Sequence, residues 1–310
     1  MKICFIGNSG HTITAYKEMK LCPEAEFVGI APGSEHEANL DFSGYGIRIF
    51  EDYKKMLDET NPDIAVVSPV FGLTGKIIIE CAERKIDVFA EKPVAGSYEE
   101  LDRVERAVKE NKIHFSAMHY LRFAPTFYLG KKLVADGAIG KVQLITAQKS
   151  YKYGNSRPAW YHDRELYTGT IPWVGIHAID WVYAFSGKKF LSVNALSVGS
   201  PEMYALCQYK MEDGVMASVN IDYLRPSTAK THGDDRIRVA GTEGVIEVFS
   251  DRIVLINKDG TQELRPTEAP KLAYDFLLKR EELTCDEVFM LTRAALAARE
   301  SADKNITVKV

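Results

Sequence analysis

The chain has few cysteines, and none of them lie close together in the sequence. The five are Cys4, Cys22, Cys81, Cys207 and Cys285, an odd number with no C-x-x-C pair. Neither a structural zinc site nor a disulfide framework is expected from such spacing, and no metal site is predicted. The pattern is typical of a protein from a reducing compartment.

Long hydrophobic runs and a charge bias are also missing. No uncharged stretch approaches the ~20 apolar residues that span a bilayer. Met1–Gly7 reads as a strand that runs into a glycine turn, which leaves no room for a signal peptide. We therefore expect a cytoplasmic protein. With 39 basic and 43 acidic residues the net charge is -4, so we expect no nucleic-acid or membrane partner.

The overall composition is that of an ordinary globular protein. The chain has 310 residues, of which 46% are hydrophobic and 26% charged. At roughly 150 residues per domain this length predicts two domains. The sequence contains no repeats and no Pro/Ser-rich linker, but its character changes after Arg122. We predict domains over residues 1–120 and 121–310, with a tight boundary near residue 120.

In the first domain, short apolar runs alternate with amphipathic segments. Continuous apolar runs are typical of strands that are buried on both faces of a parallel sheet. Tyr98–Asn111 reads as a helix that begins with an S-x-x-E capping box of Ser97 and Glu100. The pattern predicts an α/β domain with a doubly wound parallel sheet. The expected strands are Lys2–Ile6, Glu26–Ala31, Ile64–Val67, Asp87–Ala90 and Ile113–Ala117.

The second domain is predicted to be α+β. A helix over Pro125–Ala135 precedes a strand over Lys141–Tyr151, and a further helix begins near His177. Residues Val215–Tyr223 alternate apolar and polar side chains, which indicates a sheet with one buried face. Hairpin turns are expected at Asp213-Gly214 and Asp259-Gly260, a helix from Cys285 capped by Thr284 and Glu287, and a last strand over Ile306–Val310.

The first expected strand leads into the turn Gly7-Asn8-Ser9-Gly10-His11-Thr12, after which a helix begins. At this position a dinucleotide's pyrophosphate meets backbone N–H groups and the positive end of a helix dipole. Of the three glycines in G-x-G-x-x-G only Gly7 fits, because Ser9 and Thr12 occupy the other two places. We predict cofactor binding here; the alternative is a turn that binds no nucleotide.

The second diagnostic position follows the second strand, at Ala31-Pro32-Gly33-Ser34-Glu35. An NAD enzyme usually presents an acid to the ribose hydroxyls at the strand tip, and an NADP enzyme an arginine to the 2′-phosphate. Neither is present, although Ser34 offers one hydrogen bond. The sequence leaves NAD and NADP undistinguished, and Pro32-Gly33 can equally be a simple turn.

A lysine follows the fourth expected strand, in Glu91-Lys92-Pro93. Ligands of doubly wound folds bind at this edge of the sheet. A partly desolvated lysine beside a cationic nicotinamide has a lowered pKa, so that it can exchange a proton with a substrate hydroxyl at neutral pH. The alternative is a solvated surface lysine.

Several motifs occur in a fixed order and together resemble one family, the Gfo/Idh/MocA oxidoreductases, which include glucose-fructose oxidoreductase and inositol dehydrogenase. The resemblance covers essentially the whole chain. It implies a Rossmann domain followed by an α+β domain whose open, mainly antiparallel sheet commonly forms the subunit interface, so a homo-oligomer is expected. It also implies NAD(P)-dependent oxidation or reduction of sugars, polyols and related small molecules. The motifs are the first-strand glycine turn, Glu91-Lys92-Pro93, Arg122-Phe123-Ala124-Pro125, Gly175-Ile176-His177-Ala178-Ile179-Asp180 and Gly241-Thr242-Glu243-Gly244.

The resemblance assigns Lys92 and His177 as catalytic residues. Lys92 matches the lysine that touches nicotinamide and substrate, and His177 matches the acid/base on the reacting oxygen, a role that suits a neutral imidazole. Asp180 lies one helical turn after His177 and is expected either to set its tautomer or to cap the helix. The expected cofactor contacts are Gly7, Asn8, Ser9, Gly10, His11, Ser34, Pro69, Glu91 and Lys92.

The chain departs from the family pattern four residues before His177. The resemblance implies a catalytic aspartate there, but this sequence has Trp173. An indole offers one N–H donor and an apolar face and cannot accept a proton. Trp173 is expected to stack on substrate or nicotinamide; the alternative is a core aromatic. Tyr120, Trp160, Trp173 and His177 are the expected substrate contacts, within or near a polar aromatic stretch that also holds Arg157, Tyr161, His162 and Asp163.

Three functions remain open at this point. The leading hypothesis is hydride transfer between nicotinamide and a carbinol or carbonyl carbon of a sugar-like substrate. The second is a catalytically degenerate sensor or partner protein of the same fold, which would account for Ser9, Thr12, Ala31 and Trp173 together. The third is another NAD(P)-dependent reaction, such as an elimination through a transient ketone, for which Lys92 is still needed.

Overall fold

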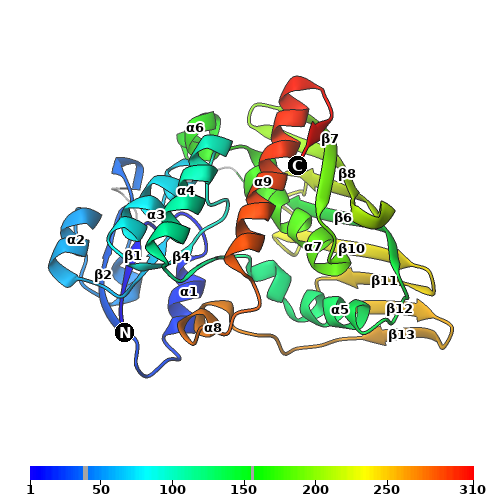
Figure 1. Ribbon diagram of the computed structural model, residues 1–310, viewed down its shortest axis with the longest axis horizontal. Helices are drawn as coiled ribbons and strands as arrows, with labels where there is room; N and C mark the ends of the chain where they lie inside the picture. Colours follow the sequence, from blue (N-terminus) through cyan, green and yellow to red (C-terminus); the bar gives the residue numbers. More distant parts are fainter. Residues whose placement is uncertain (38–40, 155–156) are drawn as a thin grey trace. The chain divides into compact units, whose positions relative to one another are not determined.

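The computed structural model describes residues 1–37, 41–154 and 157–310, and the chain divides into two compact units (Figure 1). The first unit contains Met1–Met118, Asp163–Thr168 and Pro270–Thr292. The second contains His119–His162, Gly169–Ala269 and Arg293–Val310. Each unit has one sheet.

The sheet of the first unit is parallel and has the order β2-β1-β3-β4-β5. Strand β2 is added on one side of β1, whereas β3, β4 and β5 are added on the other side. The carboxyl ends of β1 and β3 therefore flank the point where the strand order reverses, at which ligands bind in such folds. The expected parallel sheet is confirmed, and only the fifth strand begins two residues later than expected. The strands are β1 (Lys2–Ile6), β2 (Glu26–Ala31), β3 (Ile64–Val67), β4 (Asp87–Ala90) and β5 (Phe115–Ala117).

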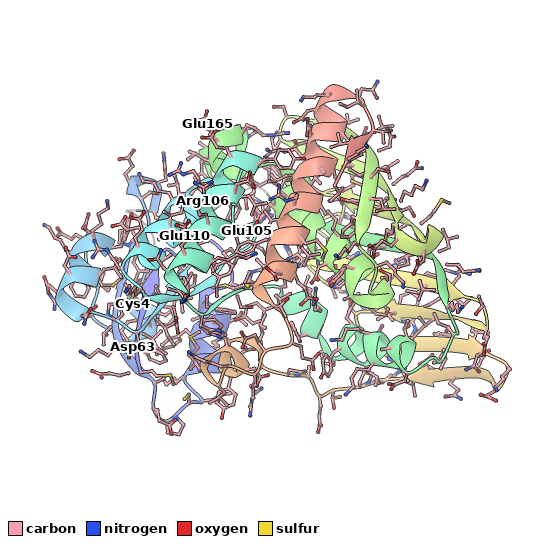
Figure 2. All side chains as sticks on the ribbon, viewed as in Figure 1. Cys4, Asp63, Glu105, Arg106, Glu110 and Glu165 are labelled. Carbon is pink, nitrogen blue, oxygen red and sulfur yellow. The ribbon has the colours of Figure 1, made fainter. Side chains whose placement is uncertain are left out.

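Helices cover this sheet: α3 packs against α4, and α1 packs against α8. On α4 the apolar side chains are buried, whereas Arg106 and Glu110 are exposed (Figure 2). The buried side chains are Leu101, Val104, Ala107 and Val108. Ser97 caps α4 by accepting a hydrogen bond from the Glu100 N–H, but the Glu100 carboxylate accepts from Gly96 instead of Ser97. The longer helices are α1 (Thr12–Met19), α2 (Tyr53–Thr60), α3 (Thr74–Glu83), α4 (Tyr98–Asn111) and α8 (Leu272–Leu277).

The sheet of the second unit is open, with the order β13-β12-β11-β10-β6-β9-β8-β7-β14. Its neighbours pair antiparallel except β6 and β9, which are parallel, so the predicted open, mainly antiparallel sheet is confirmed. The central strands are β6 (Val142–Tyr151), β9 (Met216–Asp222) and β10 (Gly233–Gly241). The others are β7 (Phe190–Gly199), β8 (Glu202–Met211), β11 (Gly244–Phe249), β12 (Ile253–Asn257), β13 (Gly260–Leu264) and β14 (Val308–Lys309).

One face of this sheet is covered by helices. Helix α7 (Ile176–Ser186) packs on β6, and α5 (Pro125–Ala135) packs on β11 and α7. Side chains on the covered face, such as Ile145 and Val219, are buried, whereas Leu206 and Met216 on the other face are more than half exposed. The alternation in the sequence is therefore confirmed: the open face of β9 carries the polar Ser218 and Asn220, and the exposed Leu206 and Met216 add apolar area to this face.

The turn and cap signals of the second half are also confirmed. Asp213 and Gly214 have φ of 55° and 76°, and Gly260 has φ of 109°, as tight hairpin turns require. Thr284 and Glu287 exchange hydrogen bonds at the start of α9 (Cys285–Lys304). The last strand is shorter than expected and covers only Val308–Lys309. No helix in the described ranges is long and apolar enough to cross a membrane.

Candidate functional site

The turn between β1 and α1 requires glycine at its first position. Gly7 has φ of 82°, and its N–H donates to the Ala31 carbonyl over 2.8 Å. A Cβ at Gly7 would overlap the backbone of Ser68 and Pro69. The turn therefore lies tightly between the ends of β2 and β3. This is the close approach for which the first glycine of a dinucleotide turn is needed.

A buried carboxylate, Glu91, closes one side of this turn. Its Oε2 accepts a hydrogen bond from the His11 N–H at 2.6 Å and lies 2.8 Å from His11 Nδ1. A Cβ at Gly10 would overlap the Glu91 carboxylate. Burial acts to raise the pKa of Glu91, but His11 and Lys92 hold that pKa below its usual value. Glu91 is thus an anion at the amino end of α1, where the helix dipole stabilises it.

A second buried carboxylate, Glu37, closes the other side. Its Oε1 accepts from the Asn8 N–H at 3.3 Å and from the Ser9 hydroxyl, and its Oε2 accepts from the Gly33 N–H at 2.8 Å. The side chain is 1% exposed, and burial raises its pKa despite these bonds. The sequence pattern did not indicate Glu37, because the diagnostic acid of an NAD enzyme is expected at the strand tip. The acid instead comes from a short 3-10 helix, Glu35–Glu37, beyond that tip.

The remaining expected cofactor residues lie at the same edge. Pro69 packs against Gly33, where a Cβ would overlap its ring. Ser34 lines a cavity of about 330 Å³, with Leu73 and Ile77 as an apolar wall and Lys76 at the side. This volume is within the usual range for small-molecule sites. The described residues at this edge thus fit the adenosine end of a dinucleotide.

Lys92 is not the solvated surface lysine of the alternative interpretation, because its side chain is only 2% exposed. Its Nζ lies 3.8 Å from Glu91 Oε1. Lys92 belongs to the first unit, whereas Tyr120 and His177 belong to the second. Tyr120 begins a 3-10 segment, Tyr120–Phe123, and His177 lies in the first turn of α7 and is 1% exposed.

Asp180, one turn after His177, has other partners than expected. Its Oδ1 accepts from Arg122 Nε at 2.7 Å and also from Arg122 Nη2, and its Oδ2 lies 3.3 Å from His119 Nδ1. Burial would raise the pKa of Asp180, but Arg122 and His119 lower it. Asp180 therefore fixes the 3-10 segment to α7. Two motifs of the resemblance, the Arg122 and His177 segments, meet through this pair.

Trp173 lies in a π-helical turn, Ile171–Gly175, directly before α7. Its backbone N–H donates to the Gly169 carbonyl at 3.0 Å, and its side chain is hydrogen-bonded to Tyr161. The Tyr161 hydroxyl also accepts from Arg157 Nη1 at 2.8 Å, and the Trp160 ring lies 4.4 Å from the Tyr161 ring. Two of the expected substrate residues, Trp160 and Trp173, are thus joined through Tyr161.

Lys149 is a buried charge that sequence reasoning missed. It lies on the covered face of β6, 1% exposed, with Nζ 2.5 Å from Asp235 Oδ1 on the neighbouring β10. The rings of Tyr151 and Trp181 lie 4.1 Å and 5.6 Å from Nζ. Burial lowers the pKa of Lys149 to about 8. Ile145, Ala147 and Lys149 are alternate residues of one strand, so they lie on the same face of the sheet. This spacing could have predicted that Lys149 is buried with the two apolar residues.

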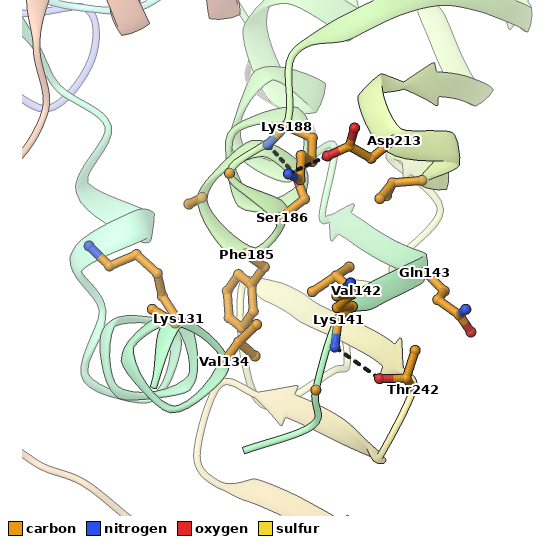
Figure 3. Close-up of a pocket in the computed structure, with 15 residues that line it drawn as sticks. Lys131, Val134, Lys141, Val142, Gln143, Phe185, Ser186, Lys188, Asp213 and Thr242 are labelled. Atoms are coloured by element: carbon orange, nitrogen blue, oxygen red, sulfur yellow. Dashed lines mark hydrogen bonds and ion pairs between the residues drawn. The ribbon is translucent and has the colours of Figure 1, made fainter. Parts of the chain in front are cut away.

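A separate cavity of about 630 Å³ lies in the second unit, between α5, the end of α7 and the start of β6 (Figure 3). Lys188 pairs there with Asp213 at 2.6 Å. None of the expected site residues lines this cavity. Within the described ranges, no group of three or more His, Cys, Asp or Glu side chains is placed to hold a metal ion.

Comparison with known proteins matches both halves of the chain to one family. Residues 1–119 match the oxidoreductase family with an NAD-binding Rossmann fold, and residues 129–247 match the GFO/IDH/MocA C-terminal domain. A solved structure of an oxidoreductase candidate from Thermotoga maritima is 40% identical, covers 100% of both chains and has a TM-score of 0.95.

Two relatives with an assigned activity are more distant. Levoglucosan dehydrogenase from Pseudarthrobacter phenanthrenivorans is 28% identical over 54% of this chain and 45% of its own length. A levoglucosan dehydrogenase structure with NADH and levoglucosan shares the fold, with a TM-score of 0.86 at 19% identity over 100% and 99% of the two chains. The 2,7-anhydro-N-acetylneuraminate hydratase of Mediterraneibacter gnavus is 33% identical over 36% of this chain and 29% of its own. The sequence matches span less than two thirds of these curated relatives.

The buried Lys149 predicts a specific pH dependence of stability. Below pH 8 the folded and unfolded chains both keep its proton, so Lys149 adds no pH dependence. Between about pH 8 and its ordinary pKa of 10.5, the unfolded chain binds more protons than the folded chain. Its contribution to the free energy of unfolding therefore rises with pH in this window.

Urea unfolding of wild type and Lys149→Met at several values between pH 7 and 10.5 measures this effect. We expect the wild-type free energy of unfolding, relative to the variant, to rise across the window by up to about 1.4 kcal/mol per unit of pKa difference. The exposed Lys258→Met variant is the control and should parallel wild type. Parallel curves for wild type and Lys149→Met would contradict the lowered pKa.

Proposed function

Because the chain belongs to the Gfo/Idh/MocA family of oxidoreductases, with an NAD-binding Rossmann domain, we propose that it transfers a hydride between nicotinamide and a carbinol or carbonyl carbon of a sugar, polyol or related small molecule. The observation that carries the proposal is the turn Gly7–Thr12. Its glycine is enforced by Pro69, and its donors converge on two buried carboxylates. Such a turn at the switch point of a parallel sheet is built to receive a dinucleotide.

The chain's own residues supply the proton chemistry of this reaction. The nicotinamide, when bound, accepts or donates the hydride. Oxidation of a carbinol also removes the hydroxyl proton, and His177 takes that proton while Lys92 donates a hydrogen bond to the same oxygen. In the reverse direction His177 returns the proton to the carbonyl oxygen. Glu91 positions the Lys92 ammonium by its charge at 3.8 Å.

Within this function, the position of Glu37 favours NAD over NADP. Its carboxylate lies against the turn donors of Asn8 and Ser9 and beside the Gly33 N–H. An acid at this edge accepts hydrogen bonds from the ribose hydroxyls of NAD and repels the 2′-phosphate of NADP. We thus infer that Glu37, which follows the end of β2 by six residues, accepts hydrogen bonds from the ribose. Residues 32–34 form the turn that directs the chain from β2 to Glu37.

The Glu37→Gln variant tests this preference. We expect the ratio of NADPH to NADH affinity to rise by about tenfold, because the carboxylate that opposes the 2′-phosphate is removed. Titration with each cofactor, followed by nicotinamide fluorescence, measures both affinities. Glu51→Gln, at an exposed position of the same unit, should leave the ratio unchanged. An unchanged ratio in Glu37→Gln would remove Glu37 from cofactor selection.

The catalytic assignment is tested by Lys92→Met and His177→Gln. Each variant should lose 10²-fold or more in kcat with a panel of polyols and aldoses, as expected for removal of a proton-transfer group. His177→Gln should bind NADH within a few-fold of wild type. Wild type that binds NADH but turns over nothing in the panel would support the sensor hypothesis instead.

Polyol oxidation gained only in Trp173→Asp would show that Trp173 suppresses the family's reaction.

We also propose that the open face of the second sheet joins two copies of the chain. Leu144, Leu196, Leu206 and Met216 are 45–57% exposed on this face, and neighbouring exposed apolar side chains of this kind mark protein interfaces. The free cysteines, four of them buried, agree with the reducing cytoplasm as the location.

Light scattering coupled to size-exclusion chromatography tests the interface. Leu206→Lys combined with Met216→Lys should convert the oligomer to a smaller species, because two buried charges per copy would lack partners. Leu278→Lys places a charge at an exposed leucine of the first unit and should leave the mass unchanged. A monomeric wild type, or an unchanged mass in the double variant, would contradict this interface.

A further inference from the structure

A cationic and aromatic cluster lies at one end of the second unit's sheet, and the proposed proton transfer does not use it. It is formed by Lys152, Tyr153, Arg157, Tyr161 and Tyr223 and is called here the tyrosine–arginine cluster. The Arg157 guanidinium carbon lies 4.8 Å from the centre of the Tyr161 ring, 5.4 Å from that of Tyr223 and 5.7 Å from that of Tyr153. The three rings therefore hold the guanidinium in place.

The cations of this cluster have only neutral partners in the described part of the chain. Arg157 Nε donates to the Tyr153 carbonyl at 2.7 Å, Nη1 to the Tyr161 hydroxyl at 2.8 Å and Nη2 to the Lys152 carbonyl at 3.5 Å. Lys152 Nζ donates to the carbonyls of Ser227 and Ala229. A guanidinium has five N–H groups, so one N–H remains on each terminal nitrogen of Arg157. That pair of N–H groups matches the two oxygens of a carboxylate.

An unsatisfied hydroxyl in the same cluster also points to a ligand. The Tyr153 hydroxyl is buried and has no hydrogen-bond partner among the described residues. Buried polar groups without a partner are rare because they lose their hydration without compensation. A ligand oxygen bound beside Arg157 would satisfy this hydroxyl.

A neighbouring histidine, His232, is also surrounded mainly by cations. The pKa of His232 is lowered by burial and then by the charges of Arg157, Lys149 and Lys152. Asp235 opposes this effect on His232, but its carboxylate is paired with Lys149. An anion that entered this region would therefore be attracted by Arg157 and Lys152, whose described partners are neutral.

The cluster is connected to the predicted acid/base residue within the same unit. Arg157 and Trp173 both bond to Tyr161, and Trp173 precedes His177 by one helical turn. In addition, Ile221 fills the space where a Cβ of Gly175 would lie, so the start of α7 rests on the end of β9, two residues from Tyr223. The cluster thus lies next to the elements that carry His177.

We propose that the substrate of this site is a sugar acid, whose carboxylate binds the two remaining N–H groups of Arg157 and the Tyr153 hydroxyl, with Lys152 as a second cation. This inference rests on the hydride transfer proposed above and names its substrate class. Trp173, in the place of the family's aspartate, removes a negative charge that would oppose such an anion. An anionic substrate thereby accounts for the departure at this position.

Matched neutral and acidic sugars test the proposal without turnover. Binding of gluconate and glucuronate, and of their neutral counterparts glucitol and glucose, is followed by intrinsic tryptophan fluorescence. We expect at least one acid to bind tenfold or more tightly than its neutral counterpart. Arg157→Met should abolish this difference, and Arg157→Lys should restore part of it. Arg252→Gln removes a cation at a distant hairpin of the same unit and should preserve the difference.

The outcomes separate this inference from the function on which it rests. Selective acid binding without any hydride transfer would retain the subsite and reject the proposed reaction. Turnover of neutral polyols with a KM unaffected by Arg157→Met would retain the reaction and overturn the subsite. Tighter binding of glucose 6-phosphate or inorganic phosphate than of either acid would also overturn it, because the anion would then be a phosphate. Loss of folding in Arg157→Met is detected by its unfolding curve, and Tyr153→Phe then serves as the second variant.

Discussion

Two buried carboxylates at the edge of the first sheet organise everything that this unit presents to a cofactor. Glu37 and Glu91 accept hydrogen bonds from opposite ends of one turn, so the conformation of that turn is fixed before a ligand arrives. Burial of each acid is costly unless its oxygens are bonded, and this cost fixes the positions of the groups around it. Lys92 is held by Glu91, and the loop after β2 is held by Glu37 through Gly33. The fixed geometry of this sheet edge thus follows from the hydrogen bonds that the two buried acids require.

The second unit uses the same principle with different residues. Asp180 is enclosed by Arg122 and His119, and this pair joins the 3-10 segment at the start of the unit to α7. Lys149 and Asp235 form a further ion pair beneath α7. A buried pair seldom stabilises a fold more than apolar residues of the same size would. Such pairs instead fix relative positions, here those of the helix that carries His177 and the strands beneath it.

Local patterns in the sequence predicted the strands and helices, whereas the partners of the buried charged side chains depend on tertiary contacts. Four of the five strands of the first sheet have the expected bounds, because strands that are buried on both faces leave uninterrupted apolar runs. Glu37 lay outside any such pattern: a three-residue 3-10 helix has no periodicity, and the partners of its acid are distant in sequence. The partners of Asp180 were also unpredictable, because helical spacing places it near His177 and says nothing of Arg122. Of these three residues, only Lys149 was predictable, because it alternates with the apolar Ile145 and Ala147 on β6.

The resemblance implies an acid at position 173, and we interpret Trp173 there as a change in charge and not as a loss of one catalytic group. The indole bonds to Tyr161, which Arg157 also holds, so the region before α7 contains a cation whose described partners are all neutral. A carboxylate at position 173 would lie within this network and would compete for the charge of Arg157. With tryptophan there, the charge of Arg157 is available to a ligand, and the nearby cations Arg157, Lys149 and Lys152 act together with burial to lower the pKa of His232. If His177 transfers the proton and Lys92 polarises the oxygen, the function of this region is to select an anionic substrate.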